Sequence, residues 1–240
     1  KPLNTEIIYN TSLNYTKATH YIANYQVNRN SRIFRVEAFY KKYNDLVKSY
    51  PVYNNNGTGY AKGIEFFLRD KKTFKNLDYW ISYSYLDTKR DFQNYPAELE
   101  PNFAAKHTAS LVVKKFITEW KAGFNSTYTF ATGRPYYDFL YNYPDNKYNI
   151  ADQGRTLNYN SMGISAEYLP SLGKKDAKTF IVLFASITNV LGQNQVYGYN
   201  YSYNGLNKEP ILPPAKRFYF IGCFLSWGID RSQDAINNNL

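Results

Sequence analysis

Apolar and polar side chains alternate with a period of two along most of the chain. Between Trp120 and Phe130, mostly apolar or aromatic residues occupy one set of alternate positions, and lysine, glycine, asparagine and threonine occupy the other. Because successive side chains of a β-strand point to opposite faces, this pattern predicts a strand with one apolar and one polar face. Segments 32–46 and 157–168 repeat the pattern.

Nine such strands are predicted, so the expected fold class is all-β with antiparallel neighbours. They cover residues 19–28, 32–46, 59–69, 77–88, 105–116, 119–131, 157–168, 178–189 and 216–228. The strand at 178–189 breaks the alternation, because Phe180 to Ile187 is apolar on both faces. One face of this strand is therefore expected to meet another packed element or a narrow wall.

The links between these strands alternate in length. Short links are expected near 29–31, 70–76, 117–118 and 169–177, and long links at 47–58, 89–104, 132–156 and 190–215. Short turns on one rim and long loops on the other are typical of an outer-membrane β-barrel, whose tilted strands span with about 9–11 residues. The pattern therefore predicts an antiparallel transmembrane β-barrel segment, with a soluble, Tyr-rich, lectin-like sandwich as an alternative.

The number of strands predicts that the barrel is larger than this chain. A bacterial barrel made of one chain closes with an even number of strands, and nine is odd. Two open edges in lipid would leave unpaired backbone groups. We therefore expect residues 1–240 to be the C-terminal part of a larger barrel, although a missed strand within 5–15 would restore an even count of ten.

Composition narrows the possible functions. The 240 residues include 26 Tyr and 16 Phe, a single Cys and two His, and the net charge is +10. The charge favours anionic partners or surfaces, whereas one cysteine excludes an internal disulfide framework. The basic residues are spread over strands and links without forming a stripe, so no nucleic-acid partner is expected. The start at Lys1 shows no signal peptide, which suggests a mature or truncated segment.

Several segments, in order, are similar to one known family. They are 35–47, 57–67, YSYLDTK at 83–89, NFAAKHT at 102–108, YTFATGRPY at 128–136, ITNVLG at 187–192 and the last strand, 217–227. Together they resemble the late barrel strands of Bacteroidetes-type TonB-dependent outer-membrane receptors. The family's plug domain and TonB-engaging box are absent from these residues, so we expect either a fragment or a barrel that has lost energised gating.

The resemblance implies a location, an orientation and partners. It implies a roughly 22-stranded, multi-pass barrel in the bacterial cell outer membrane, with a plugged lumen, extracellular long links and periplasmic short links. Implied partners are membrane lipid and lipopolysaccharide, the plug and the rest of the barrel, the TonB complex through the missing N-terminal part, and a possible surface lipoprotein. The last strand resembles the terminal insertion strand, with Tyr219, Ile221, Leu225 and Trp227 alternating along it.

Two sets of side chains are candidate functional residues. Tyrosines in the long links offer rigid contact area and hydroxyl groups to a ligand, or they pack together as a rim. They are Tyr136, Tyr137, Tyr141, Tyr143, Tyr197, Tyr199, Tyr201 and Tyr203. Charged residues expected to face the lumen, where they pair with one another or with a plug or contact substrate, are Arg35, Glu37, Glu65, Arg69, Lys114, Lys121 and Glu167.

Chemistry on the chain itself is not expected. No serine–histidine–aspartate spacing, phosphate loop or CxxC pattern is present, so we predict no enzyme activity and no cofactor. The acidic residues at 87, 91, 98 and 100 suit either calcium or a solvated loop. The expected function is TonB-dependent uptake of a scarce nutrient, namely a siderophore, haem, a glycan or a peptide. The alternative is a scaffolding barrel in an outer-membrane assembly or secretion complex.

Overall fold

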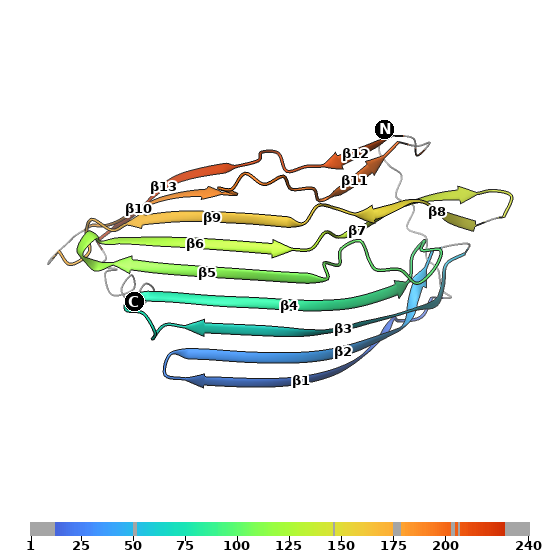
Figure 1. The fold of residues 1–240 in the computed structure, drawn as a ribbon, viewed down its shortest axis with the longest axis horizontal. Helices are drawn as coiled ribbons and strands as arrows, with labels where there is room; N and C mark the ends of the chain where they lie inside the picture. The colour runs from blue at the N-terminus through green and yellow to red at the C-terminus, as the bar shows by residue number, and fades with distance from the viewer. Residues whose placement is uncertain are drawn as a thin grey trace.

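The computed structural model describes residues 13–49, 52–145, 147–174, 179–202, 205 and 207–228. Nine strands form one antiparallel sheet in the order β1-β2-β3-β4-β5-β6-β9-β10-β13 (Figure 1). They are β1 (Lys17–Arg29), β2 (Arg32–Lys48), β3 (Asn54–Asp70), β4 (Leu77–Asp91), β5 (His107–Ile117), β6 (Ala122–Ala131), β9 (Tyr159–Tyr168), β10 (Thr179–Thr188) and β13 (Phe218–Trp227). Each matches one of the nine predicted strands, so the predicted fold class is confirmed.

Four further strands lie inside two of the long links and were not predicted. They form two separate hairpins, β7 (Pro135–Asn142) with β8 (Lys147–Arg155), and β11 (Gly198–Tyr201) with β12 (Lys208–Ile211). The first hairpin gives no period of two, because large apolar or aromatic side chains occupy both faces between Tyr136 and Tyr141. The strand β12 contains Pro210, which lowers strand propensity.

The β5–β6 link corrects one predicted boundary. Thr118–Trp120 form a short 3-10 helix (η1), and Lys121 adopts a left-handed conformation with φ of 52°. Its backbone N–H donates to the Thr118 carbonyl, which closes the turn. The strand β6 therefore begins at Ala122 rather than at residue 119, and Lys121 lies in the turn. No helix among the described residues is long and apolar enough to cross a membrane.

The short turns and long links lie at opposite ends of the sheet, as predicted. Figure 1 shows the turns after β1, β3, β5 and β9 at the left end, and the β7–β8 and β11–β12 hairpins at the right end. We call these the short-turn end and the long-loop end. Antiparallel neighbours joined in sequence place alternate links at alternate ends, so this sorting follows from the topology.

The strand register divides the sheet into a polar and an apolar face. Residues opposite one another in an antiparallel pair share a face. The face that carries Lys114, opposite Asn125, is called the polar face. The other carries Leu111 opposite Tyr128 and is called the apolar face. Large side chains on six adjacent strands are exposed on it, namely Ile64, Ile81, Leu111, Phe124, Ile164 and Leu183.

Charged residues on the apolar face leave an uncharged stretch between them. On β3 they are Lys62, at the middle of the strand, and Asp70, at its short-turn end. These positions are eight residues apart in the sequence, which corresponds to roughly 26 Å along a strand. Because the strands of outer-membrane barrels are tilted by about 35–45°, this length corresponds to an uncharged band roughly 19–22 Å tall, somewhat narrower than the apolar band of such barrels, roughly 25 Å.

A small hydrophobic core lies at the short-turn end. Phe116 and Phe180 are buried against Leu169 and Leu172, which come from the turn after β9. Phe180 retains only 5% of its accessible surface. The first part of β10, at Phe180 and Val182, therefore meets a packed element as predicted, and that element is the turn before the strand.

The sheet is open among the described residues, with β1 and β13 at its edges. Because all neighbours are antiparallel and nine strands are present, the two edge strands run in the same direction. Residues 13–16 form no strand, and positions 5–12, where a tenth strand was considered, lie outside the described residues. Strand β13 exposes Tyr219, Ile221, Leu225 and Trp227 on its apolar face, with Ile221 86% accessible.

Candidate functional site

Three segments meet at the long-loop end of the sheet. They are the β4–β5 link, the β7–β8 hairpin and the β11–β12 hairpin, which continues from β10 towards β13 (Figure 1). The β7–β8 hairpin is fixed at its base, because the Arg134 N–H donates to Thr156 Oγ1 at 3.0 Å and the Thr156 N–H donates to the Arg134 carbonyl at 2.9 Å. The sheet thus positions loops that carry most of the predicted tyrosines.

One ammonium group joins the two hairpins. Lys208 Nζ of β12 donates to the Tyr136 hydroxyl of β7 at 2.5 Å and to Asp152 Oδ2 of β8 at 2.9 Å. The Tyr201 hydroxyl donates to the same Asp152 oxygen at 2.6 Å. The ammonium also lies 4.0 Å from the Tyr136 ring centre and 4.5 Å from that of Tyr199. We call these five residues the Lys208 cluster.

The Lys208 cluster stabilises its own charges. Hydrogen bonds from Tyr201 and Lys208 lower the pKa of Asp152 below that of an ordinary aspartate. Hydrogen bonds with Tyr136 and Asp152 raise the pKa of Lys208. Burial, followed by its hydrogen bond to Asp152, raises the pKa of Tyr201. The lysine–aspartate pair therefore remains ionised over the ordinary pH range, with Tyr201 protonated beside it.

A second group of aromatic rings joins the β4–β5 link to the first hairpin. Tyr95 is buried, with its ring centre 4.8 Å from that of Phe92, 6.0 Å from Tyr137 and 5.4 Å from Phe139. Burial raises the pKa of Tyr95, so its hydroxyl stays protonated. These rings hold the link against the hairpin.

Ion pairs account for most of the acidic residues that were considered for calcium. Glu100 pairs with Arg155 of β8, Asp91 with Lys48 at 2.5 Å, and Asp87 with Lys62 at 3.3 Å. The described residues contain no group of three or more histidine, cysteine or acidic side chains that could hold a metal ion. The acidic loop is thus organised by cations of the chain itself.

An open cavity of about 420 Å³ lies beside these hairpins. Arg134 and Tyr197 contribute to its lining, together with Tyr159, Leu157 and the threonine at position 129. The Arg134 side chain is exposed and has no ion pair or side-chain hydrogen bond with another described residue. The cavity thus combines one unpaired guanidinium with hydroxyl groups and apolar walls.

The structure separates the predicted tyrosines into different groups. Three belong to the Lys208 cluster, one packs on Tyr95, two lie at the tip of the β7–β8 hairpin, one lines the cavity, and one lies outside the described residues. In that order they are Tyr136, Tyr199 and Tyr201; Tyr137; Tyr141 and Tyr143; Tyr197; and Tyr203. The Tyr141 and Tyr143 ring centres are 4.8 Å apart, and Tyr143 is 80% accessible.

Sequence reasoning missed the roles of Lys208, Asp152, Tyr95 and Arg134. In the sequence Lys208 is one of several basic residues in the long links, whereas the structure places it among tyrosines from two hairpins. The local sequence offers one signal, since a lysine and an aspartate stand within tyrosine-rich links. The pairing of this lysine with this aspartate depends on how the two hairpins dock, so their spacing in the sequence does not predict it.

Six of the seven charged residues expected to face the lumen share the polar face. Glu37 lies opposite Glu65 and accepts a hydrogen bond from Asn24 at 2.9 Å. Arg69 donates two hydrogen bonds to Asp78, at 2.9 and 2.6 Å. The other residues on this face are Arg35, Lys114 and Glu167. The seventh, Lys121, is in the β5–β6 turn instead.

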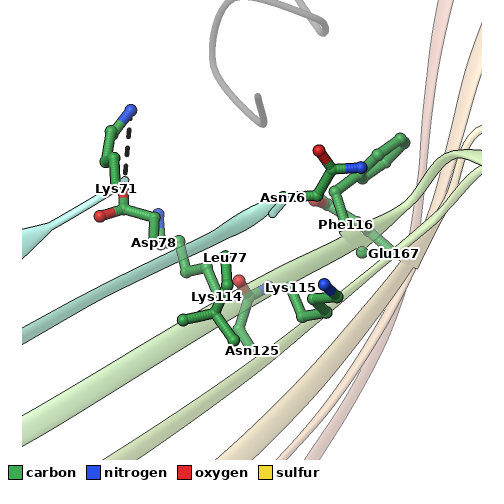
Figure 2. Close-up of a pocket in the computed structure, with 10 residues that line it drawn as sticks. Lys71, Asn76, Leu77, Asp78, Lys114, Lys115, Phe116, Asn125 and Glu167 are labelled. Atoms are coloured by element: carbon green, nitrogen blue, oxygen red, sulfur yellow. Dashed lines mark ion pairs between the residues drawn. The ribbon is translucent and has the colours of Figure 1, made fainter. Parts of the chain in front are cut away.

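Figure 2 shows a small pocket on the polar face near the short-turn end. It has a volume of about 30 Å³ and is lined by Lys71, Asp78, Lys114 and Glu167 among others. The dashed line in Figure 2 marks the ion pair of Lys71 with Asp78, at 3.8 Å. This volume is enough for about one water molecule, so the pocket does not accommodate a larger ligand.

No protein-family model matches this sequence, and no curated protein matches it. Solved structures do match in fold. The outer membrane transporter YddB of Escherichia coli superposes with a TM-score of 0.59 at 14% identity, over 89% of this chain and 32% of the transporter. The chain has the fold of an outer-membrane receptor barrel.

Two further structures show the same receptor-barrel fold. The ferric yersiniabactin uptake receptor FyuA of Yersinia pestis gives a TM-score of 0.61 at 12% identity, over 88% of this chain and 29% of the receptor. The ferripyoverdine receptor of Pseudomonas aeruginosa gives a TM-score of 0.61 at 11% identity, over 88% of this chain and 27% of the receptor. The chain thus spans about a third of the length of the structures it matches. The Bacteroidetes-type resemblance stays a prediction.

Proposed function

We propose that this chain is the C-terminal part of the wall of an outer-membrane receptor that imports a scarce nutrient with energy delivered through TonB. The observation that carries the proposal is the apolar face, whose exposed band is uncharged over roughly 26 Å between Lys62 and Asp70. An exposed apolar band of this width is stable against hydrocarbon and unfavourable in water.

The placement of the links supports an orientation. Outer-membrane barrels have short periplasmic turns and longer extracellular loops. The long-loop end, with the Lys208 cluster and the cavity, therefore faces the outside of the cell. A plug and the rest of the barrel would cover the polar face, whose paired charges suit a wet interior.

Ligand capture is best supported at the cavity beside the hairpins. Arg134 offers a guanidinium that has no partner among the described residues, and Tyr197 and Tyr159 offer rings and hydroxyl groups at the same cavity. Tyr136, Tyr199 and Tyr201 already contact Lys208 and are half-buried, so less of their surface is free for a ligand. We infer that the ligand carries an anionic group for Arg134 and apolar or ring surface for the tyrosines.

The titles of the matched structures suggest which ligands to test first. They name ferric citrate, ferric catecholate, ferric yersiniabactin and ferripyoverdine as cargo of those receptors. Citrate and catecholate chelates are anionic, which suits Arg134 and the net charge of +10. A ferric siderophore is therefore the first candidate substrate, ahead of haem, a glycan or a peptide.

Uptake by the full-length protein in its outer membrane tests this function. Cells that carry the protein should accumulate iron-55 supplied as ferric citrate or a ferric catecholate, and accumulation should stop when TonB is removed. Arg134→Gln should reduce uptake about ten-fold, since a charge-assisted hydrogen bond is lost. Lys147→Gln, on the exposed edge of the same hairpin, should leave uptake unchanged. Uptake that continues without TonB and is unchanged by Arg134→Gln would contradict the proposal.

A scaffolding barrel is the second candidate. The Lys208 cluster favours it, because three of the predicted ligand tyrosines are engaged by Lys208 or by its partner Asp152, as expected for a rim that packs on itself. A scaffold predicts co-purification of the full-length protein with a stable outer-membrane complex and no energised uptake of any ferric ligand. Import with TonB dependence would exclude it.

A further inference from the structure

A hollow of about 680 Å³ interrupts the apolar face. Its lining comes from β5, β6, β9, β10 and β13 and is almost entirely apolar. Neighbouring strands of a sheet are about 4.8 Å apart, so a groove across five strands is roughly 19 Å long. The hollow is therefore elongated, and it crosses the strands instead of following one of them.

Small side chains in register with large ones produce this shape. Ala166 of β9 lies opposite Phe124 on one side and, through the next strand, opposite Ala185. Ala185 in turn lies opposite Ile221 of β13. Small residues on two adjacent strands make the hollow deepest over β9 and β10, where Phe124 on one side and Ile221 on the other rise above them.

A cation stands at the end of the hollow that faces the short turns. Lys115 lies opposite Phe124 and belongs to the lining. Its Nζ donates to the Lys75 carbonyl in the β3–β4 turn at 2.5 Å, and it has no ion pair with another described residue. The ammonium is therefore anchored at the short-turn rim with two N–H groups left over.

We propose that this hollow binds one acyl chain of an anionic phospholipid whose phosphate contacts Lys115. The proposal rests on the proposed function, because it requires the apolar face to lie in a membrane. An elongated apolar groove fits a hydrocarbon chain, and a lysine at the interface is a point charge suited to a phosphate. The lining follows one register row straight across the strands, so in strands tilted by about 45° a chain in the groove leans about 45° from the membrane normal.

Native mass spectrometry of the full-length protein in detergent tests the proposal. Phosphatidylglycerol and phosphatidylcholine with the same acyl chains are supplied separately at matched ratios. The unmodified protein should retain one phosphatidylglycerol at about a ten-fold lower lipid concentration than phosphatidylcholine. Lys115→Gln should abolish this preference, and Ala166→Phe, which fills the groove, should remove the retained lipid.

Two matched variants control for charge and bulk. Lys42→Gln removes a lysine at the opposite rim, and Ala38→Phe adds a ring to the apolar face on β2, outside the hollow. Both should retain lipid like the unmodified protein. Equal retention of the two lipids, or retention that survives Ala166→Phe, would overturn the proposal and indicate only non-specific lipid around the protein.

Membrane fractionation separates this inference from the proposed function. A full-length protein that sediments with outer membranes but binds no lipid tightly would overturn the lipid site alone. A protein absent from the membrane fraction would overturn both. If a partner protein occupies the hollow instead, lipid will be retained by the isolated protein and lost from its purified complex with that partner. That result would also overturn the lipid site.

Discussion

Lys208 connects two hairpins through a single ammonium group. Its Nζ contacts Tyr136, 72 positions away in the sequence, and Asp152, 56 positions away. A cation close to aromatic faces and paired with a carboxylate is attracted by both. At the scale of residues, this contact is the clearest determinant of how the long-loop end is arranged.

Replacing Lys208 by methionine keeps an unbranched chain of nearly the same length and removes the ammonium. We expect amides of β11 and β12 to exchange with deuterium about ten-fold faster, because the hairpin then opens more often. Hydrogen–deuterium exchange on the full-length protein measures this. Lys147→Met, a lysine of β8 exposed to solvent, is the matched control and should change nothing. Equal exchange in both variants would show that the hairpins are held by other contacts.

The pH dependence of the hairpin contact follows from the two shifted groups. The pKa of Asp152 is lowered in the folded protein. Its contribution to the stability of the hairpin contact is therefore fully present above the ordinary aspartate pKa of about 3.9, and it disappears as pH falls through the lower pKa of the folded state. The pKa of Lys208 is raised, so its contribution is present below the ordinary lysine value of about 10.4 and disappears as pH rises through the higher folded value.

The stability of the contact between the two hairpins should therefore be constant from about pH 5 to about pH 9. The distance between spin labels on Leu140 and Glu209, one on each hairpin, measures their separation in the full-length protein. Separation of the hairpins near neutral pH would contradict the assignment of the charge pair. A label pair within the β7–β8 hairpin alone provides the reference, since it does not span the contact.

At the scale of elements, each strand of the large sheet presents a different chemistry on its two faces. Leu111 lies near the middle of β5 on the apolar face, and Thr127 lies near the middle of β6 on the polar face. The local alternation could be read from the sequence because it depends only on backbone geometry. The exception at β10 was also readable, but its partner, the Leu169–Leu172 turn, was not.

Arginine at position 111 should destabilise the inserted barrel. Charged side chains on the lipid face near the bilayer centre cost about 2–4 kcal/mol. We therefore expect Leu111→Arg to lower the unfolding free energy by that amount in lipid vesicles, measured by denaturant titration of the full-length protein. Thr127→Arg, on the polar face, should cost much less. An equal loss in the two variants would mean that the faces are assigned incorrectly.

At the scale of the whole molecule, the open sheet requires partners at both edges. Strand β13 and strand β1 leave backbone groups unpaired among the described residues, which is costly in hydrocarbon. The matched receptors are about three times as long as this chain, which covers 32% of YddB. If the apolar face lies in a membrane, as proposed, we expect further strands, from the same polypeptide or from other copies, to close the barrel.

The intact mass of the native polypeptide, taken from purified outer membranes, distinguishes these cases. We expect a mass roughly three-fold above the 28.0 kDa of this chain, because a plugged receptor supplies the missing strands within one polypeptide. A mass near 28.0 kDa would instead indicate a barrel assembled from several copies or a split barrel, and would favour the scaffolding function.

The sequence by itself determined where the nine strands lie, which of their faces is apolar, and that the short and long links alternate. These features depend on neighbours within a few residues and on the two-residue period of an extended backbone. The start of β6 after Lys121 was not predicted, because a left-handed turn residue does not change the two-residue period. The hairpin strands at 135–155 were not predicted, because aromatic side chains on both faces remove that period.

Only the tertiary structure decided which distant side chains meet. The placement of Lys208 among Tyr136 and Tyr199, the cavity beside Arg134 and the hollow over Ala166 all depend on strand register and on how hairpins dock. Register is a collective property of paired strands, and a shift by one residue would move every side chain to the other face. Local sequence patterns do not encode such contacts, so the candidate site emerged only from the folded arrangement.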